Sequence, residues 1–142
     1  MRRRTRAREI ALQLLYQVDI RREELDSIIG DFLENQLCDM DESDLSIKEF
    51  AATLAKGAIE NIKIIDSTIS SYAQNWQLER MAVIDRNIMR MACYELLYVD
   101  DIPPKVSINE AVDLAKKYGD TESGKFVNGI LDKIKKNQAK EK

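Results

Sequence analysis

The chain has 142 residues, 33 % of them charged and 6 % aromatic, with two prolines and five glycines, which suits one domain of long helices with a sizeable core. Its formal charge of −3 is unevenly spread: residues 1–8 carry five arginines and no acid, whereas residues 23–49 carry ten acids and one lysine. The lack of histidine excludes imidazole catalysis and His-ligated metals, and no apolar run approaches the roughly 20 residues of a membrane-spanning helix, so we expect a cytoplasmic protein.

Residues 5–20 are predicted to form an amphipathic helix, because apolar residues recur there at helical spacing. The inward stripe comprises Ala7, Ile10, Ala11, Leu14, Leu15 and Val18. The opposite side carries Arg2, Arg6, Glu9, Gln13 and Tyr16. An outward tyrosine beside arginines can stack on an unpaired base while the guanidinium groups hold phosphates. The alternative is a solvated charged face with a half-buried tyrosine, but the five clustered arginines favour nucleic acid.

A second helix is predicted over residues 24–37. Its inward positions are Leu25, Ile28, Ile29, Phe32 and Leu33. The acidic segment 38–44 that follows is aperiodic and reads as a solvated loop. Cys38 and Cys93 show no Cys-x-x-Cys spacing, so both are expected to be free thiols in a reducing cytosol.

Ser46 and Glu49 match a capping box, in which both side chains satisfy the first free amides of a helix. That helix is predicted to continue to Ala73, with a bend near Gly57. Its apolar positions are Phe50, Leu54, Ala58, Ile62, Ile65, Ile69 and Tyr72. Tyr72 can be a core residue or a second stacking platform, and Trp76 is expected to anchor the join between two halves of the chain.

Residues 83–99 are predicted to form a central helix that is apolar nearly all round, which is typical of a helix that others pack against. Its polar exceptions are Asp85, Arg86, Asn87, Arg90 and Glu95. We interpret Arg86, Arg90 and the adjacent Asp85 as an exposed patch open to a partner. Glu95 lies within the apolar surround, so it should be paired, accepting backbone amides at the start of a neighbouring helix.

The C-terminal third is predicted to hold two more helices. Pro103-Pro104 forces an extended connector, and Ser107 with Glu110 forms a second capping box. That helix ends at Gly119, and the last one begins near Ser123. Its buried side chains are Val127, Ile130, Leu131 and Ile134. Gly129 within it costs about 1 kcal/mol against alanine, which indicates a close approach of another helix.

The segment from Gly119 to Lys125 matches the spacing of a phosphate-binding loop but lacks its final Ser or Thr, because Phe126 stands there. That loop also follows a strand, whereas residues 113–118 read as a helix, so we reject an NTPase. The amides of a helix start, Lys125 and an exposed Phe126 can instead serve RNA. The alternative places Phe126 in the core.

Several motifs occur together in the second half of the chain. They are Trp76, Arg80, Asp85-Arg86, Arg90, Tyr94-Glu95-Leu96, Ile102-Pro103, Ile108-Asn109-Glu110-Ala111 and Lys125-Phe126-Val127-Asn128-Gly129. With the arginine-rich start and Leu15-Tyr16, this pattern resembles the NusB family of bacterial transcription antitermination factors. The likeness runs from about Arg3 to Lys133, although residues 22–46 carry little of it.

The resemblance implies a single all-α domain of six to seven helices, packed as two sub-bundles over about residues 1–75 and 76–142. It implies no enzyme and no cofactor. It implies binding of single-stranded boxA RNA in ribosomal RNA leader transcripts together with the ribosomal protein NusE, within an RNA polymerase antitermination complex. The implied RNA-binding residues are Arg3, Arg4, Arg6, Tyr16, Tyr72, Glu122, Lys125 and Phe126. Asp85 and Arg86 are the residues implied to face NusE.

Two other interpretations compete with RNA binding. The first is a protein-only helical adaptor or homodimeric interaction module, in which the arginines only aid solubility. The second is an accessory domain of an RNA methyltransferase, which would make this chain a fragment. No metal cluster, activated nucleophile or paired carboxylates in an evident cleft can be recognised in the sequence.

Overall fold

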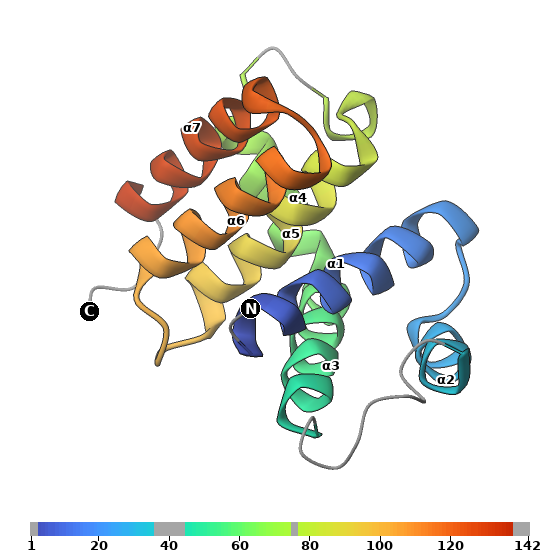
Figure 1. The fold of residues 1–142 in the computed structure, drawn as a ribbon. Coiled ribbons are helices and arrows are strands. Elements are labelled where there is room, and N and C mark those ends of the chain that lie inside the picture. Colours follow the sequence, from blue (N-terminus) through green and yellow to red (C-terminus); the bar gives the residue numbers. More distant parts are fainter. Residues whose placement is uncertain (1–2, 36–44, 75–76, 138–142) are drawn as a thin grey trace. The chain divides into compact units, whose positions relative to one another are not determined.

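The computed structural model describes residues 3–35, 45–74 and 77–137, and the side chains of residues 31–35 are not described. Within these ranges the chain forms seven α-helices and one 3-10 helix (Figure 1). They are α1 (Arg3–Arg21), α2 (Leu25–Asn35), α3 (Leu45–Glu60), α4 (Ile62–Tyr72), the 3-10 helix η2 (Leu78–Arg80), α5 (Val83–Tyr98), α6 (Pro104–Tyr118) and α7 (Thr121–Asn137). The predicted all-α class with six to seven helices is confirmed. None of the described helices is long and apolar enough to cross a membrane.

The chain divides into two compact units, Met1–Glu60 and Asn61–Lys142. The boundary lies where α3 ends and α4 begins, at Asn61 (φ −110°, ψ 21°). The two sub-bundles were predicted to meet near residue 75. The observed boundary lies earlier in the chain, and α4 therefore belongs to the second unit. The helix predicted to continue to Ala73 with a bend near Gly57 is thus two helices, and the break lies four residues after Gly57. Asparagine suits such a break, since its side chain competes for backbone hydrogen bonds.

In the first unit, α1 packs against α3 and α2. The predicted inward stripe of α1 is confirmed, with its five residues from Ala7 to Leu15 buried and Val18 half-buried. In α2, Leu25 and Ile28 are buried as predicted. Glu9 is a correction, because it was placed on the outward side and is only 3 % exposed. Residues on more than one side of α1 are therefore covered, which a single apolar stripe does not predict.

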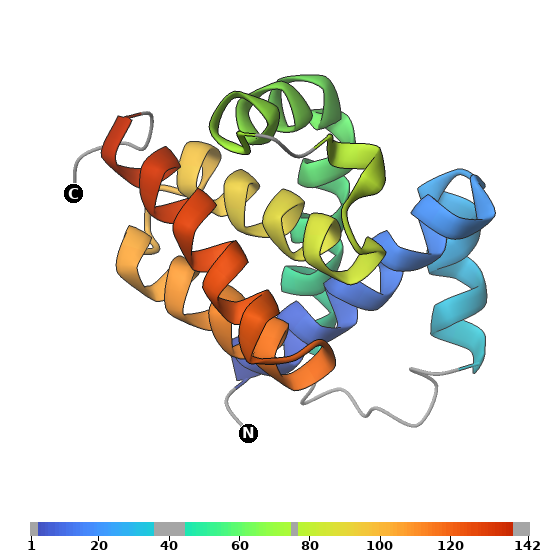
Figure 2. The ribbon, with the colours of Figure 1, turned by 90° about the horizontal axis from the view of Figure 1, so that it is seen from above.

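In the second unit, α5 contacts α4, α6 and α7, and α6 packs along α7 (Figure 2). This confirms the predicted central helix. Its buried apolar side chains are Ile88, Met89, Met91, Ala92, Cys93 and Leu96. Cys93 is a free thiol, as predicted. Burial, followed by the charge of Asp66, raises the pKa of the Cys93 thiol to about 12, so it stays protonated.

The predicted capping box at Ser107 is wrong, because α6 begins three residues earlier, at Pro104. Proline suits the first position of a helix, where its missing N–H is not needed. Ser107 is instead buried, and its Oγ donates a hydrogen bond of 2.9 Å to Glu95 Oε1. The buried Glu95 is therefore paired at the start of a neighbouring helix, as expected, with the Ser107 hydroxyl as its donor; its pairing with backbone amides stays a prediction. Ser46 does not precede its helix either, because α3 begins one residue earlier, at Leu45. The last helix, α7, begins at Thr121, two residues before the predicted start near Ser123.

The glycine with close neighbours is Gly119 and not the predicted Gly129. A Cβ at Gly129 would meet no described atom within 4 Å, so the predicted close approach there is wrong. A Cβ at Gly119 would lie 2.5 Å from Ser123 Oγ and 2.8 Å from the Ala115 carbonyl oxygen. The tight approach is thus between the end of α6 and the first turn of α7.

A few predictions fall outside the described residues. They concern Arg2, Cys38, Trp76 and the acidic segment 38–44. The side chains of Phe32 and Leu33 likewise lie in the range where side chains are not described.

Candidate functional site

The arginines predicted to bind RNA lie in the first turn of α1, where Arg3, Arg4 and Arg6 are exposed. Arg3 Nη1 donates a hydrogen bond of 3.3 Å to Ser46 Oγ on α3. The guanidinium carbon of Arg4 lies 4.4 Å from the centre of the Phe50 ring, a distance typical of a cation–π contact. Two of the three arginines therefore also contact α3, which orients the basic start of the helix.

Tyr16 is 39 % exposed, which confirms that it points away from the core. It follows Arg6 by ten residues, a distance of about 15 Å along a helix axis. Gln13 between them is also exposed. One side of α1 thus presents a basic end and an accessible aromatic ring.

The other predicted RNA-binding residues belong to the second unit. Tyr72 is the last residue of α4 and is half-buried. Glu122 and Lys125 are exposed in the first turns of α7, where Lys125 Nζ lies 3.5 Å from Glu122 Oε1. Such an exposed pair contributes at most about 1 kcal/mol, so Lys125 can exchange this partner for a phosphate.

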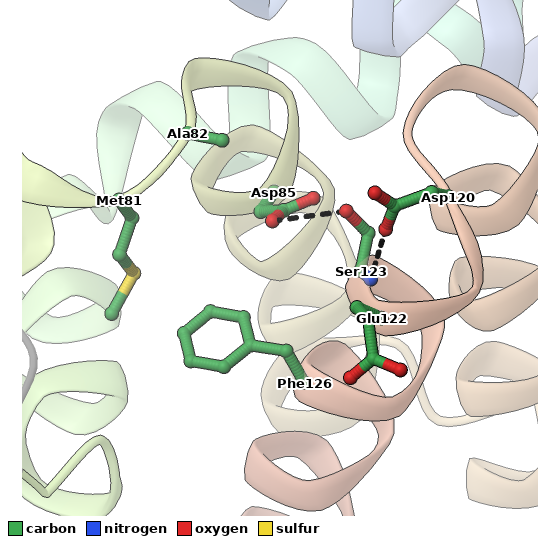
Figure 3. A pocket seen from close by; sticks show the side chains of 7 residues that line it. All are labelled: Met81, Ala82, Asp85, Asp120, Glu122, Ser123 and Phe126. Atoms are coloured by element: carbon green, nitrogen blue, oxygen red, sulfur yellow. Dashed lines mark hydrogen bonds between the residues drawn. The ribbon is translucent and has the colours of Figure 1, made fainter.

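Phe126 lines an open pocket of about 420 Å³ in the second unit. The described residues that line it are Met81, Ala82, Asp85, Asp120, Glu122, Ser123 and Phe126. Figure 3 shows the Phe126 ring extending from α7 toward Met81, with Asp85 above it on α5. Phe126 is half-buried, so it forms a pocket wall, which is neither the fully exposed platform nor the core position considered above.

The first turn of α7 is held in place by its own cap. Asp120 Oδ1 accepts a hydrogen bond of 2.8 Å from the amide of Ser123, as an aspartate preceding a helix commonly does. The small residue Gly119 lets α6 end directly against Ser123. The short α6–α7 connection therefore positions Ser123 and Asp120 at the pocket.

Asp85 corrects the predicted exposed patch, because it is only 8 % exposed. Ser123 Oγ donates a long hydrogen bond of 3.4 Å to Asp85 Oδ2 (Figure 3). Asp85 Oδ1 is buried and has no hydrogen-bond partner among the described residues. Burial raises the pKa of Asp85; the bond from Ser123 lowers it, and the charge of Asp120 raises it further. Among the described residues, the ionised carboxylate is thus incompletely satisfied.

Arg90 also departs from the predicted patch. Arg90 forms a two-pronged ion pair with Asp66 on α4, with Nε–Oδ1 and Nη2–Oδ2 distances of 2.8 and 3.0 Å. Its Nη1 donates to Oδ1 of the buried Asn87 at 3.1 Å. Arg90 therefore joins α4 to α5. Arg86 is half-buried, and its Nη1 donates to the Glu79 carbonyl oxygen at 3.3 Å.

The predicted residues thus fall into two sets, Arg3, Arg4, Arg6 and Tyr16 in the first unit and the others in the second. The structure brings together Asp85, Glu122 and Phe126, which the sequence analysis assigned to two different surfaces. It adds Met81, Ala82, Asp120 and Ser123, which were missed. Only Asp120 carried a signal, as an acidic cap three residues before Ser123.

The chemistry of these surfaces is that of binding. In the described parts of the chain, no group of three or more His, Cys, Asp or Glu side chains is arranged to hold a metal ion. The first unit offers cations and a ring, and the second offers a pocket with carboxylates and apolar walls.

Comparison with known proteins gives a consistent result. The pattern of the NusB family matches residues 5–136. The transcription antitermination protein NusB of Chloroherpeton thalassium is 45 % identical over 129 residues, which is 91 % of this chain and 59 % of that protein. The protein of the same name from an Anaeromyxobacter species is 46 % identical over 132 residues, covering 93 % of this chain and 89 % of the relative.

Solved structures agree with the sequence comparison. T. maritima NusB superimposes with a TM-score of 0.85 at 44 % identity, covering 99 % of this chain and 94 % of that one. A chain in the crystal structure of the antitermination factors NusB and NusE in complex with dsRNA gives a TM-score of 0.83 at 32 % identity, with 96 % and 98 % covered.

Proposed function

The chain belongs to the NusB family of transcription antitermination proteins, and we propose that it binds single-stranded boxA RNA of ribosomal RNA leader transcripts together with the ribosomal protein NusE. Membership confirms the resemblance noted in the sequence, and the family is not enzymatic. A solved relative is found with NusE and RNA. We place the protein in the cytoplasm, as a component of an RNA polymerase antitermination complex.

The observation that supports this proposal most is the accessible Tyr16 ring on a helix that starts with exposed arginines. Single strands are bound by such combinations, because bases stack on aromatic rings while cations follow the phosphates. Helix α1 holds both groups on one rigid element, so the strand meets a preformed surface.

The second unit offers further contacts of the same kind. Lys125 is exposed near the start of α7 and can hold a phosphate. Phe126 and Tyr72 are half-buried rings, each accessible enough for partial stacking. We propose that these residues of the second unit also contact RNA.

The test of the arginines is the salt dependence of RNA binding. Each phosphate contact of a single strand contributes about −0.7 to the slope of log K against log salt. Replacing Arg3 and Arg6 by glutamine should therefore reduce the slope by about 1.4 and weaken binding to a labelled boxA strand. The matched control replaces the exposed Lys133 and Lys135 of α7 by glutamine, which removes the same charge elsewhere. Equal effects of the two double variants would contradict the assignment.

The test of the ring is Tyr16→Ala, measured with the same RNA. Stacking on one aromatic side chain is worth about 1–3 kcal/mol, so affinity should fall between about fivefold and a hundredfold. Tyr118→Ala is the control, because Tyr118 is 42 % exposed and outside the proposed surface. If neither the arginines nor Tyr16 affect RNA affinity, the protein-only adaptor becomes the better interpretation.

A further inference from the structure

The basic start of α1 lies against α3 within the first unit (Figure 1), and its arginines meet α3 at two side chains. Arg3 Nη1 donates to Ser46 Oγ at 3.3 Å. One turn further along α3, the centre of the Phe50 ring lies 4.4 Å from the guanidinium carbon of Arg4 and 5.7 Å from that of Arg8. Both distances are within the range of about 6 Å for a cation–π contact. A single ring therefore contacts two arginines that are one turn apart on α1.

The two arginines on this ring differ in exposure. Arg8 is 2 % exposed, so it belongs to the interior of the unit and to the packing that fixes the half-buried Phe50 ring. Arg4 is exposed and is one of the proposed RNA-binding residues. Of the two guanidinium groups on the ring, only that of Arg4 can therefore be reached by a nucleic acid.

We propose that Phe50 is a positioning residue for RNA binding, which holds the guanidinium of Arg4 in place for a phosphate before the RNA arrives. The inference rests on the RNA binding proposed above. It adds a residue of α3 that the sequence analysis counted only among the apolar positions of its helix. The ring acts through Arg4 and does not itself contact the RNA.

The geometry of a cation–π contact suits this role. A guanidinium is planar and stacks on an aromatic ring through its face, whereas its five N–H donors lie in the plane of the group. Stacking on Phe50 therefore does not use the donors with which an arginine binds a phosphate in a two-pronged manner. The contact also restricts rotation of the long Arg4 side chain, so less conformational entropy is lost when the RNA binds.

The experiment is a double-mutant cycle of Phe50→Leu and Arg4→Gln in the full chain, with the affinity for a labelled boxA strand as the readout. Leucine keeps an apolar side chain at the half-buried position but removes the ring. Phe50→Leu should weaken binding about two- to fivefold, as expected for an exposed cation–π contact. This loss should vanish in the Arg4→Gln background. Phe50→Tyr keeps a ring and should bind RNA like the unaltered chain.

The matched control is a cycle of Phe50→Leu with Arg6→Gln. Arg6 is a nearby exposed arginine of α1, whereas the described cation–π contacts of the Phe50 ring are with Arg4 and Arg8. The two losses of affinity should therefore add in the control cycle. Thermal unfolding of every variant shows whether it is folded, and Phe50→Met takes the place of Phe50→Leu if the leucine variant is not.

Three results would overturn the inference while RNA binding itself stands. They are an unchanged affinity in Phe50→Leu, a loss that Phe50→Tyr does not restore, and a loss that is equally large in the Arg4→Gln background. In the last case the ring would act through the fold or stack on a base itself. If the unaltered chain does not bind boxA RNA, the proposed function fails first, and the inference fails with it.

Discussion

Replacing Arg90 by alanine tests whether this residue is structural, as its contacts indicate, or part of an exposed partner patch. The ion pair with Asp66 has two contacts of 2.8 and 3.0 Å. The side chains of Arg90 and Asp66 are 14 % and 27 % exposed. The pair is therefore intermediate between a surface pair, worth up to about 1 kcal/mol, and a buried pair, whose disruption costs about 3–5 kcal/mol.

Because the exposure of the pair is intermediate, we expect its loss in Arg90→Ala to lower the free energy of unfolding by about 2 kcal/mol. The hydrogen bond from Arg90 Nη1 to Oδ1 of the buried Asn87 is lost as well, which adds about 1 kcal/mol. The total is about 3 kcal/mol, a large part of the stability of a small domain.

The assay is urea unfolding followed by circular dichroism, with hydrogen exchange to locate the loss in α4 and α5. A double-mutant cycle with Asp66→Ala isolates the pair, and its coupling energy should be about 1–2 kcal/mol. Arg80→Ala is the control, since Arg80 is an exposed arginine of the same unit and its removal should change stability by less than about 0.5 kcal/mol. If Arg90→Ala is no more destabilising than Arg80→Ala but weakens NusE binding, the exposed-patch interpretation is correct after all.

Three further changes follow from the structure. Gly129→Ala should raise the midpoint of thermal unfolding, because the Cβ meets no described atom and alanine favours a helix by about 1 kcal/mol. Gly119→Ala should lower the midpoint, at a cost of about 1–3 kcal/mol, because its Cβ would lie 2.8 Å from a backbone oxygen; equal midpoints for the two variants would contradict both assignments. Asp85→Asn should be stabilising at neutral pH. Burial raises the pKa of Asp85 from its ordinary 3.8, so the folded state binds more protons above pH 3.8 and stability falls as pH rises through the folded pKa. The gain in melting temperature from Asp85→Asn should thus grow from below pH 3.8 to neutral, and a gain independent of pH would refute this account.

Helical periodicity was the most reliable signal in the sequence. The stripe from Ala7 to Leu15 and the apolar central helix were recognised because side chains three and four residues apart share a face. The outward position of Tyr16 follows from the same geometry. Helix starts were placed less well, since Pro104 and Ser107 both suit a first turn and local preference does not choose between them.

Residues whose roles depend on another helix were not predictable in this way. Arg90 and Asp66 are 24 positions apart, and Asp85 and Ser123 are 38 positions apart, so no local pattern links either pair. The sequence indicated crowding at Gly129, yet of these two glycines only Gly119 has a residue of another helix, Ser123, where a Cβ would be.

By itself, the sequence determined that the protein is all-helical, which sides of most helices face the core, and the family to which it belongs, because these properties rest on local periodicity and on motifs within single segments. Tertiary structure alone decided that Asp85 is buried, that Arg90 joins two helices, and that α5 and α7 enclose an acidic pocket. The physical reason is that burial and charge pairing are properties of a side chain's neighbours, and packing supplies those neighbours from distant parts of the chain.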